Sequence, residues 1–505
     1  MVRAFHLGAT AAVLALTGVL IGTATAQSRT AYTTRFATAL TYQNVGTSTT
    51  NLQLNLYREN DGTQVTISGL PQLTLAPGAG NSLAVGQMSF TQGGFKGAGF
   101  LSSDQLVVAT TVQVPIASLV RNRPLSNGFS PDAGAARFLL ASTLKNAFDT
   151  TTQFSVQNID DVGADISIEF FDATSNPPGA LIFAATQTMT NLPAGSARYY
   201  DLGKINALPT GFNGSARITA RKTGTQIDGR VVATAIELST TGLGASAFEG
   251  VAGGANTVYM PAAVCQAFSP AQTSIYAIQN VESSGGANAS VFVTYRYRPD
   301  NNPSATLQTL TTGAVTIAPG GKASFNACLN GLPAGSTGSA TISSTGGKIV
   351  GIAKVQGGGY STAALGATSG AAKLAFPYIR TTMVYFDTPA PGETDTRQRV
   401  SLAIQNVGST IPVGVLTIRY IDRNGAQVGT THTNSVAITP GDKFNSNPTN
   451  AGSAANEFGY YGNGQFGGSA IVQCTSCAIV GIARVQTRVN AVTIGAEDYN
   501  GIPVP

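Results

Sequence analysis

Short stretches in which apolar and polar residues alternate recur at regular intervals along the chain. The clearest examples are residues 52–56, 166–170, 291–295 and 416–420, each with apolar side chains at every second position. Alternation with a period of two indicates a strand with one buried and one exposed face. Since no sustained helical period occurs, we expect an all-β protein.

Each alternating stretch follows the same phrase, an apolar segment that ends in Gln-Asn and one apolar residue. The four copies are Leu40–Val45, Phe154–Ile159, Tyr276–Val281 and Leu402–Val407. Their glutamines, at positions 43, 157, 279 and 405, are 114, 122 and 126 residues apart. The Gln-Asn pair allows two interpretations: side chains that bond nearby backbone groups, or a ladder of ligand sites.

Further landmarks follow each Gln-Asn pair in a fixed order. A Pro-Gly or Ala-Gly turn comes next, at residues 77–78, 194–195, 319–320 and 440–441. A segment that begins with Gly-x-Ala or a close variant follows, at residues 97, 214, 338 and 468. We interpret that last segment as a β-hairpin. Landmarks that recur in one order indicate four diverged copies of a single structural unit.

Each copy has about 120 residues and about seven short strands separated by turns, an ordinary size for one domain. This pattern predicts four tandem immunoglobulin-like antiparallel β-sandwich repeats, with an up-and-down barrel as the alternative for each unit. The predicted boundaries are 27–134, 135–255, 256–372 and 373–505, and the last repeat has enlarged loops. The Cys-Trp-Cys core of antibody domains is absent, because the chain contains no Trp.

With these repeats, the chain resembles secreted bacterial proteins built of tandem immunoglobulin-like domains, which serve as adhesins, stalks and cell-envelope components. The resemblance covers everything after residue 26, rests on repeat architecture, and implies an extracellular spacer or binding role. The Gly/Ala-rich segments Leu243–Ala245, Leu365–Ala367 and Ile494–Ala496 are interpreted as linkers. Four linked sandwiches predict a semi-rigid multi-domain rod.

The N-terminus has the three parts of a secretory signal peptide: Arg3, an apolar core over residues 11–21, and a small-residue exit at Ala24-Thr25-Ala26. We predict a signal peptide over residues 1–26 and a secreted, extracellular or cell-surface protein. No later segment is long and apolar enough to span a membrane as a helix.

The charge composition argues against nucleic-acid binding. Charged residues make up 10% of the chain, and without Arg3 the 28 basic and 24 acidic residues give a net charge of +4. No Lys/Arg cluster of the kind that binds nucleic acid is present. We therefore expect the partner to be a cell-envelope or extracellular surface component.

Four cysteines in an exported chain suggest two disulfides. Cys474 and Cys477 flank a two-residue loop, at cross-strand spacing that a disulfide can bridge. This pairing leaves Cys265 with Cys328. The alternatives are a thioredoxin-like C-x-x-C, which needs a helix N-terminus, and a zinc site, which needs more ligands than the chain offers.

The sequence shows no catalytic constellation. After removal of His6 with the signal peptide, His432 is the only imidazole left, and it lies in a polar strand-like stretch that favours a solvated residue. The pairs Asp160/Asp161 and Glu169/Asp172 lack the context of a carboxylate-pair glycosidase. We predict no enzyme activity, no cofactor and no metal.

The fourth repeat departs from the others in two enlarged loops. One contains Asp387, Glu393 and Asp395, and the other contains Tyr460 and Tyr461. Long loops on a rigid sandwich are frequent binding sites, although surface insertions also accumulate at little cost to stability. The primary prediction is a non-enzymatic structural or adhesive surface protein. The alternatives are a carbohydrate- or calcium-binding module that uses these loops, and a β-sandwich hydrolase.

The C-terminal residues 502–505 follow a phrase that elsewhere leads into a new unit. They could supply an edge strand to another molecule, which would give self-association, or form a disordered remnant of repeat duplication.

Overall fold

The computed structural model describes residues 35–505 except 60, 66–73, 89–93, 117–119, 121, 240–243, 382–396, 453–466 and 491. The predicted signal peptide lies outside the described residues. The strands fall into four consecutive groups, which we call units 1 to 4. Helical structure in the described part of the chain consists of 3-10 turns: η1 (Val85–Gln87), η3 (Pro131–Ala133), η4 (Phe183–Ala185), η5 (Leu202–Lys204), η6 (Pro299–Asn301) and η7 (Pro448–Ala451).

Units 1 and 2 have these strands. Unit 1 contains β1 (Arg35–Asn44), β2 (Thr50–Arg58), β3 (Gln64–Val65), β4 (Thr74–Leu75), β5 (Gly80–Ala84), β6 (Gly97–Ser103), β7 (Val107–Ile116) and β8 (Leu125–Asn127). Unit 2 contains β9 (Arg137–Lys145), β10 (Thr150–Asn158), β11 (Ala164–Asp172), β12 (Ala180–Leu181), β13 (Gln187–Leu192), β14 (Ala197–Asp201), β15 (Phe212–Lys222), β16 (Val231–Ser239) and β17 (Ala245–Glu249).

Units 3 and 4 repeat the series. Unit 3 contains β18 (Thr257–Val264), β19 (Thr273–Asn280), β20 (Ala289–Arg298), β21 (Gln308–Thr311), β22 (Val315–Ile317), β23 (Lys322–Asn326), β24 (Thr337–Gly346), β25 (Ile349–Gly357) and β26 (Tyr360–Leu365). Unit 4 contains β27 (Lys373–Ile379), β28 (Arg397–Asn406), β29 (Leu416–Asp422), β30 (Gln427–Thr433), β31 (Lys443–Ser446), β32 (Gly468–Cys474), β33 (Ile479–Val489), β34 (Val492–Asn500) and β35 (Ile502–Pro503).

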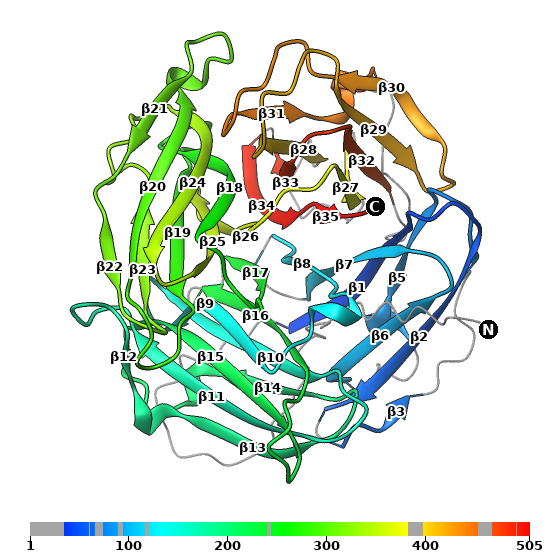
Figure 1. Ribbon diagram of the computed structural model, residues 1–505. Coiled ribbons are helices and arrows are strands. Elements are labelled where there is room, and N and C mark those ends of the chain that lie inside the picture. Colours follow the sequence, from blue (N-terminus) through cyan, green and yellow to red (C-terminus); the bar gives the residue numbers. More distant parts are fainter. Residues whose placement is uncertain are drawn as a thin grey trace.

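Each unit is a sandwich of two antiparallel sheets, which confirms the predicted fold class. We call the sheet of each unit that contributes β8, β17, β26 or β34 to the centre of the molecule the inner sheet, and the other the outer sheet (Figure 1). The inner sheets have the orders β5-β1-β7-β8, β14-β10-β16-β17, β23-β19-β25-β26 and β31-β28-β33-β34. The outer sheets are built around β2, β11, β20 and β29. In immunoglobulin constant domains the first strand lies beside the second and the last beside the sixth. In unit 2 the first strand, β9, pairs with β15, and β16, the counterpart of the last immunoglobulin strand, pairs with β10. Relative to the immunoglobulin domain, the first and last strands have therefore exchanged sheets.

The burial patterns explain why the two sheets differ. The outer strands β2, β11 and β20 alternate between buried and less buried residues, as the sequence predicts; β20 alternates along all ten of its residues. Middle strands of the inner sheets, such as β10, β16 and β25, are buried on both faces: β16 has eight consecutive buried residues, Val231 to Leu238. A strand buried on both faces reads as a nearly continuous apolar run. The face of each inner sheet that points away from the core of its own unit must therefore be covered by another part of the molecule.

The segment interpreted as a hairpin is a connection between the two sheets, which corrects the prediction. In unit 3, β24 pairs with β18 and β20 in the outer sheet, whereas β25 pairs with β19 and β26 in the inner sheet. The same crossing occurs from β6 to β7, from β15 to β16 and from β32 to β33. The two strands of this segment therefore pair with neighbours in different sheets and do not form a hairpin.

The four units form a closed ring, so the prediction of a rod is wrong. Figure 1 shows them around a common centre, with unit 4 beside unit 1. The strands β8, β17, β26 and β34 contact one another in a circle at this centre. Ring closure includes a hydrogen bond from the Gly80 N–H to the Arg423 carbonyl (3.2 Å) and one from Asn127 Nδ2 to the Asn500 carbonyl (2.8 Å).

Apolar burial drives this closure. The core of unit 2 is continuous with Ala277, Val350 and Ile352 on the inner sheet of unit 3. In the same way, Val112 and Leu125 of unit 1 complete the core of unit 4. Smaller apolar clusters join unit 1 to unit 2, through Phe36 and Ile236, and unit 3 to unit 4, through Ala262 and Ile482. Separation of the units would therefore expose apolar surface at every junction.

The segments interpreted as linkers lie at the ends of the units, in or beside strands of the ring centre. Ile494–Ala496 lies within β34, Ala245 begins β17, and Leu365 ends β26. The C-terminal tail is also ordered: Ile502 and Pro503 of β35 pair with Ala375 and Leu374 of β27. Neither interpretation of the tail, as a donated edge strand or a disordered remnant, describes this arrangement within one chain.

Candidate functional site

The Asn of the recurring Gln-Asn pair bonds backbone groups in every unit. Asn158 donates from Nδ2 to the carbonyls of Val162 (2.8 Å) and Leu192 (2.9 Å) and accepts from the N–H of Asp160 (2.9 Å). Equivalent contacts are made by Asn44, Asn280 and Asn406. This confirms the interpretation as local backbone bonding, because these amides are occupied by loop carbonyls.

In units 3 and 4 the Gln of the same pair also bonds a carbonyl of the preceding unit. Gln279 Nε2 donates to the carbonyl of Gly320 in its own unit (3.1 Å) and to the carbonyl of Ala216 in unit 2 (3.2 Å). The Gly320 carbonyl also accepts from Ser215 Oγ of unit 2 (2.6 Å). One buried amide thus ties the turn of unit 3 to the preceding unit.

The Pro-Gly and Ala-Gly turns are the contact points of all four joints. Their glycines have φ between +77° and +79° and face the preceding unit around the ring: Gly78 faces Gly425, Gly195 faces Tyr57, Gly320 faces Phe171 and Gly441 faces Arg296. The left-handed backbone and the close approach both favour glycine. The recurring turns therefore hold the ring together.

Both cysteine pairs are joined as predicted. Cys265 pairs with Cys328 in unit 3 and Cys474 pairs with Cys477 in unit 4, with Cα–Cα distances of 5.1 and 5.5 Å. No free cysteine occurs in the chain. The disulfides are compatible with an oxidising compartment.

The environment of His432 differs from the expected solvated strand. His432 Nδ1 lies 2.8 Å from Ser446 Oγ, which also lies 2.8 Å from the Tyr420 hydroxyl. The His432 ring packs against Phe444, and partial burial lowers the pKa of the imidazole. Ser446 is 1% exposed, so its hydroxyl is not presented to a substrate.

The predicted ligand-loop residues cannot be placed. Asp387, Glu393, Asp395, Tyr460 and Tyr461 all lie outside the described residues. The site that the structure does show is elsewhere, between units 2 and 3.

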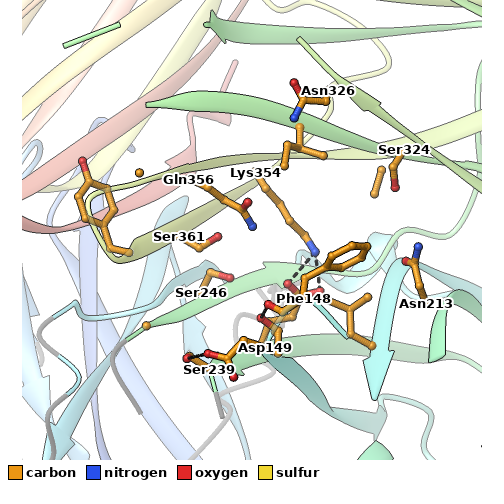
Figure 2. A pocket seen from close by; sticks show the side chains of 18 of the residues that line it. Phe148, Asp149, Asn213, Ser239, Ser246, Ser324, Asn326, Lys354, Gln356 and Ser361 are labelled. Carbon is orange, nitrogen blue, oxygen red and sulfur yellow. Dashed lines mark hydrogen bonds and ion pairs between the residues drawn. The ribbon is translucent and has the colours of Figure 1, made fainter. Parts of the chain in front are cut away.

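A cavity of about 540 Å³ lies at that joint, within the range of small-molecule sites. In Figure 2, Phe148, Asp149, Asn213, Ser239 and Ser246 of unit 2 lie around the same space as Ser324, Asn326, Lys354, Gln356 and Ser361 of unit 3. On the unit 3 side the lining residues follow the period of two of strands β23 and β25. One wall of the cavity is therefore the face of the unit 3 inner sheet that points toward unit 2. The cavity lies where unit 2 does not fully cover this face.

A buried ion pair joins the two units beside this cavity. Lys354 Nζ contacts both carboxylate oxygens of Glu237, at 2.7 and 2.8 Å, and donates to Ser142 Oγ at 2.8 Å. Ser142 Oγ in turn donates to Glu237 at 2.7 Å. Both charges are thus paired and hydrogen-bonded, as burial requires.

A second lysine lines the cavity without a carboxylate in contact. Lys322 is 2% exposed, and its ammonium donates to Asn213 Oδ1 of unit 2 at 2.5 Å. Burial, together with the charge of Lys354 and against that of Glu237, lowers the pKa of Lys322 to about 7. Near neutral pH this group changes charge inside the cavity.

Two apolar side chains stand at the cavity with unusual exposure. Phe148 is 77% exposed and Leu329 is 86% exposed. Phe148 and Asp149 form a hairpin turn with φ of +51° and +57°, where Asn-Gly or Asp-Gly is the preferred pair. A bulky residue with positive φ is an outlier, and such strain concentrates at functional sites.

The sequence contains one indication of this site, a charged residue within each of two mostly apolar strands. Glu237 and Lys354 interrupt otherwise apolar strands, β16 and β25. A charge within a strand buried on both faces requires a partner. That partner could not be named from the sequence, because the two residues are 117 positions apart in different units.

Within the described residues, no group of three or more His, Cys, Asp or Glu side chains is placed to hold a metal ion. None of the helices there is long and apolar enough to cross a membrane.

No protein-family model and no curated protein sequence matches the chain. Among solved structures, it shows a similarity to red sea bream transglutaminase, with 11% sequence identity and a TM-score of 0.11. The matched region covers 49% of this chain and 31% of the transglutaminase. A TM-score this low does not indicate a common fold.

Proposed function

We propose that the chain is a non-enzymatic exported binding protein whose ring presents the cavity between units 2 and 3 to a small polar ligand. The observation that carries this proposal is the cavity of about 540 Å³, lined by side chains from two units that are fixed by a common joint. Ligand sites are typically concave, preformed and located at domain interfaces. Export rests on the N-terminal sequence pattern and is supported by the two disulfides.

The lining favours a sugar-sized polyhydroxylated ligand. Amide side chains such as Asn213 and Gln356 both donate and accept hydrogen bonds, as hydroxyl groups do, and several serines add to them. Phe148 and Leu329 offer apolar surface for the C–H face of a ring. This proposal keeps the carbohydrate-binding alternative from the sequence but assigns it to a different place than the loops of unit 4.

A structural or adhesive role at a cell surface stays a prediction. The ring does not provide the extended shape that was expected for such a role, but the cavity is available as the recognition site of an adhesive protein. The hydrolase alternative is tested with polysaccharides and peptides, because a hydrolase would release new products from them. We expect these substrates to be recovered unchanged.

Replacement of Phe148 by glycine tests the site. We expect the variant to be as stable as the parent or more stable by about 1 kcal/mol, because glycine adopts positive φ without strain. We expect its sugar binding to be weakened, because the exposed ring is lost. The measurements are thermal unfolding and saturation-transfer NMR with glucose, galactose, N-acetylglucosamine and glucuronate.

Phe268→Gly is the matched control. Phe268 also has positive φ (+69°) and is 46% exposed, but it lies in unit 3 and does not line the cavity. It should show the same stability change with unaltered binding. Equal binding by the Phe148 and Phe268 variants, or no binding of any sugar by the parent, would contradict the proposed function.

A further inference from the structure

The charges around the cavity are equal in number, but Lys322 is not paired with a carboxylate. Lys322 and Lys354 contribute two cations, and Glu237 is fully engaged with Lys354 and Ser142. Asp149 lies at the exposed turn, bonds Ser239 Oγ at 3.0 Å, and does not figure among the charges that act on Lys322. The Lys322 ammonium is thus a buried cation whose nearest described partner is a neutral amide.

Burial of such a cation is unfavourable without an anion. Desolvation and the neighbouring Lys354 both act against the charged form, as the lowered pKa of Lys322 shows. An anionic group beside Lys322 would reverse both effects, because opposite charges in a site of low dielectric attract strongly. The cavity is open on this side, since Ser324, two residues further along the same face of β23, is exposed.

We infer that the cavity takes a monosaccharide-sized uronic acid, with its carboxylate bound by the Lys322 ammonium and its ring lying against Phe148. The inference rests on the proposed function and narrows the ligand class. A carboxylate matches the site better than a phosphate dianion, because one cation is available rather than several. Asn213 Nδ2 and Ser324 Oγ line the same region and can donate to the second carboxylate oxygen.

This site gives binding a specific pH dependence. The carboxylate binds the charged form of Lys322, which loses its proton above a pKa of about 7 in the free protein. Affinity for a uronic acid should fall by up to about tenfold per pH unit above that value, because one proton must be taken up. Lys354, Glu237 and Asp149 are the other charged groups at the cavity; the first two are paired with each other. A neutral sugar should not show this dependence.

The test uses the full mature chain and isothermal titration with glucuronate, glucose and acetate at pH 6.0 and pH 8.5. We expect glucuronate to bind best at pH 6.0 and to lose about tenfold or more in affinity at pH 8.5. Lys322→Met should lower the affinity for glucuronate about tenfold or more at pH 6.0 and lower that for glucose much less, because only glucuronate has a carboxylate. Lys348→Met, at an exposed lysine in the same unit, is the control and should bind as the parent does.

Thermal unfolding of Lys322→Met checks that the variant is folded; removal of an unpaired buried charge should not lower its midpoint. Equal, pH-independent binding of glucose and glucuronate would overturn the uronic acid inference and leave the proposed function intact. Acetate binding as tight as that of glucuronate would overturn it too, because the site would then select an anion alone. Absence of binding by every sugar would instead contradict the proposed function.

Discussion

Glu497→Gln is expected to raise the free energy of unfolding at pH 8 by about 4–5 kcal/mol, with no gain near pH 4.5. Glu497 lies on β34 at the contact between units 4 and 1 and is 3% exposed. One of its oxygens accepts from the backbone N–H of Arg123 in unit 1. Glutamine keeps that acceptor and cannot carry the charge.

The sign follows from the proton balance. Burial, with a smaller contribution from Asp498, raises the pKa of Glu497 from 4.5 to about 8 against the opposing effects of Arg123. Between these values the folded protein holds a proton that the unfolded chain has released, so stability falls as pH rises from 4.5 to 8. The Glu497→Gln variant escapes that loss, and urea unfolding at pH 4.5, 6 and 8 measures the difference.

Asp498→Asn is the matched comparison and should have the opposite effect. Asp498 is the next residue on β34 and forms a two-pronged contact with Arg484, at 2.6 and 2.8 Å. Removal of its charge leaves a buried guanidinium without its counter-ion, which costs about 3 kcal/mol or more. Destabilisation by Glu497→Gln at pH 8, or a gain of the same size at every pH, would show that Glu497 is ionised in the folded ring.

The same reasoning extends to a second carboxyl at the ring centre. Burial raises the pKa of Glu249 to about 7, and its oxygen accepts from the backbone N–H of Asn127 in unit 1. Glu249 on β17 connects unit 2 to unit 1, and Glu497 on β34 connects unit 4 to unit 1. The closed ring should therefore be more stable in mildly acidic than in alkaline solution as far as these two groups decide it.

The sequence predicts the structure within a unit much better than the structure between units. Alternation along β11 and β20, and the turn after Asn158, follow from local physics: period-two burial and side-chain-to-backbone bonding. The disulfide between Cys265 and Cys328 followed from counting cysteines in an exported chain. Each of these inferences requires no knowledge of a neighbouring unit.

The ring could not be predicted by the same means. From the sequence, the mostly apolar strands β16 and β25 are interpreted as one half of a hairpin within a unit, which does not predict a neighbouring unit on their second face. Only the arrangement in space shows that the second face is covered by the next unit. The cavity shares this origin, because its two walls come from different repeats.

The contacts between units explain why the same turn contains glycine in all four units. Glycine recurs in the Pro-Gly or Ala-Gly turn of every unit, while the residue that faces it from the preceding unit varies: Gly425, Tyr57, Phe171 or Arg296. A small residue with positive φ is the shared requirement, because it lets the turn approach whatever surface the preceding unit offers. The recurring glycine was therefore a sign of contact between units as well as of a turn.

Gly320→Ala is the second variant with a large expected effect, a loss of about 3 kcal/mol in the free energy of unfolding. Gly320 has φ of +79°, where a side chain costs about 1 kcal/mol. A Cβ at this position would also lie 2.5 Å from the ring of Phe171 in unit 2, and the joint bonds from Ser215 and Gln279 to the Gly320 carbonyl resist a shift of the turn. Overpacking of this kind adds about 1–3 kcal/mol.

Gly414→Ala separates the two contributions. Gly414 has nearly the same φ, +77°, but a Cβ there would meet nothing within 4 Å. Its variant should lose only the backbone part, about 1 kcal/mol. The difference between the two variants in urea unfolding then measures the contact between units 2 and 3.

In the double variant Phe171→Ala/Gly320→Ala the clash is absent, so the double-mutant cycle should show a favourable coupling of about 1 kcal/mol or more. A loss at Gly320 no larger than at Gly414, with no coupling to Phe171, would mean that this turn does not pack against unit 2 in solution. Since Lys322 lies two residues beyond Gly320, a displaced turn should weaken sugar binding as well, whereas Gly414→Ala should leave it unchanged.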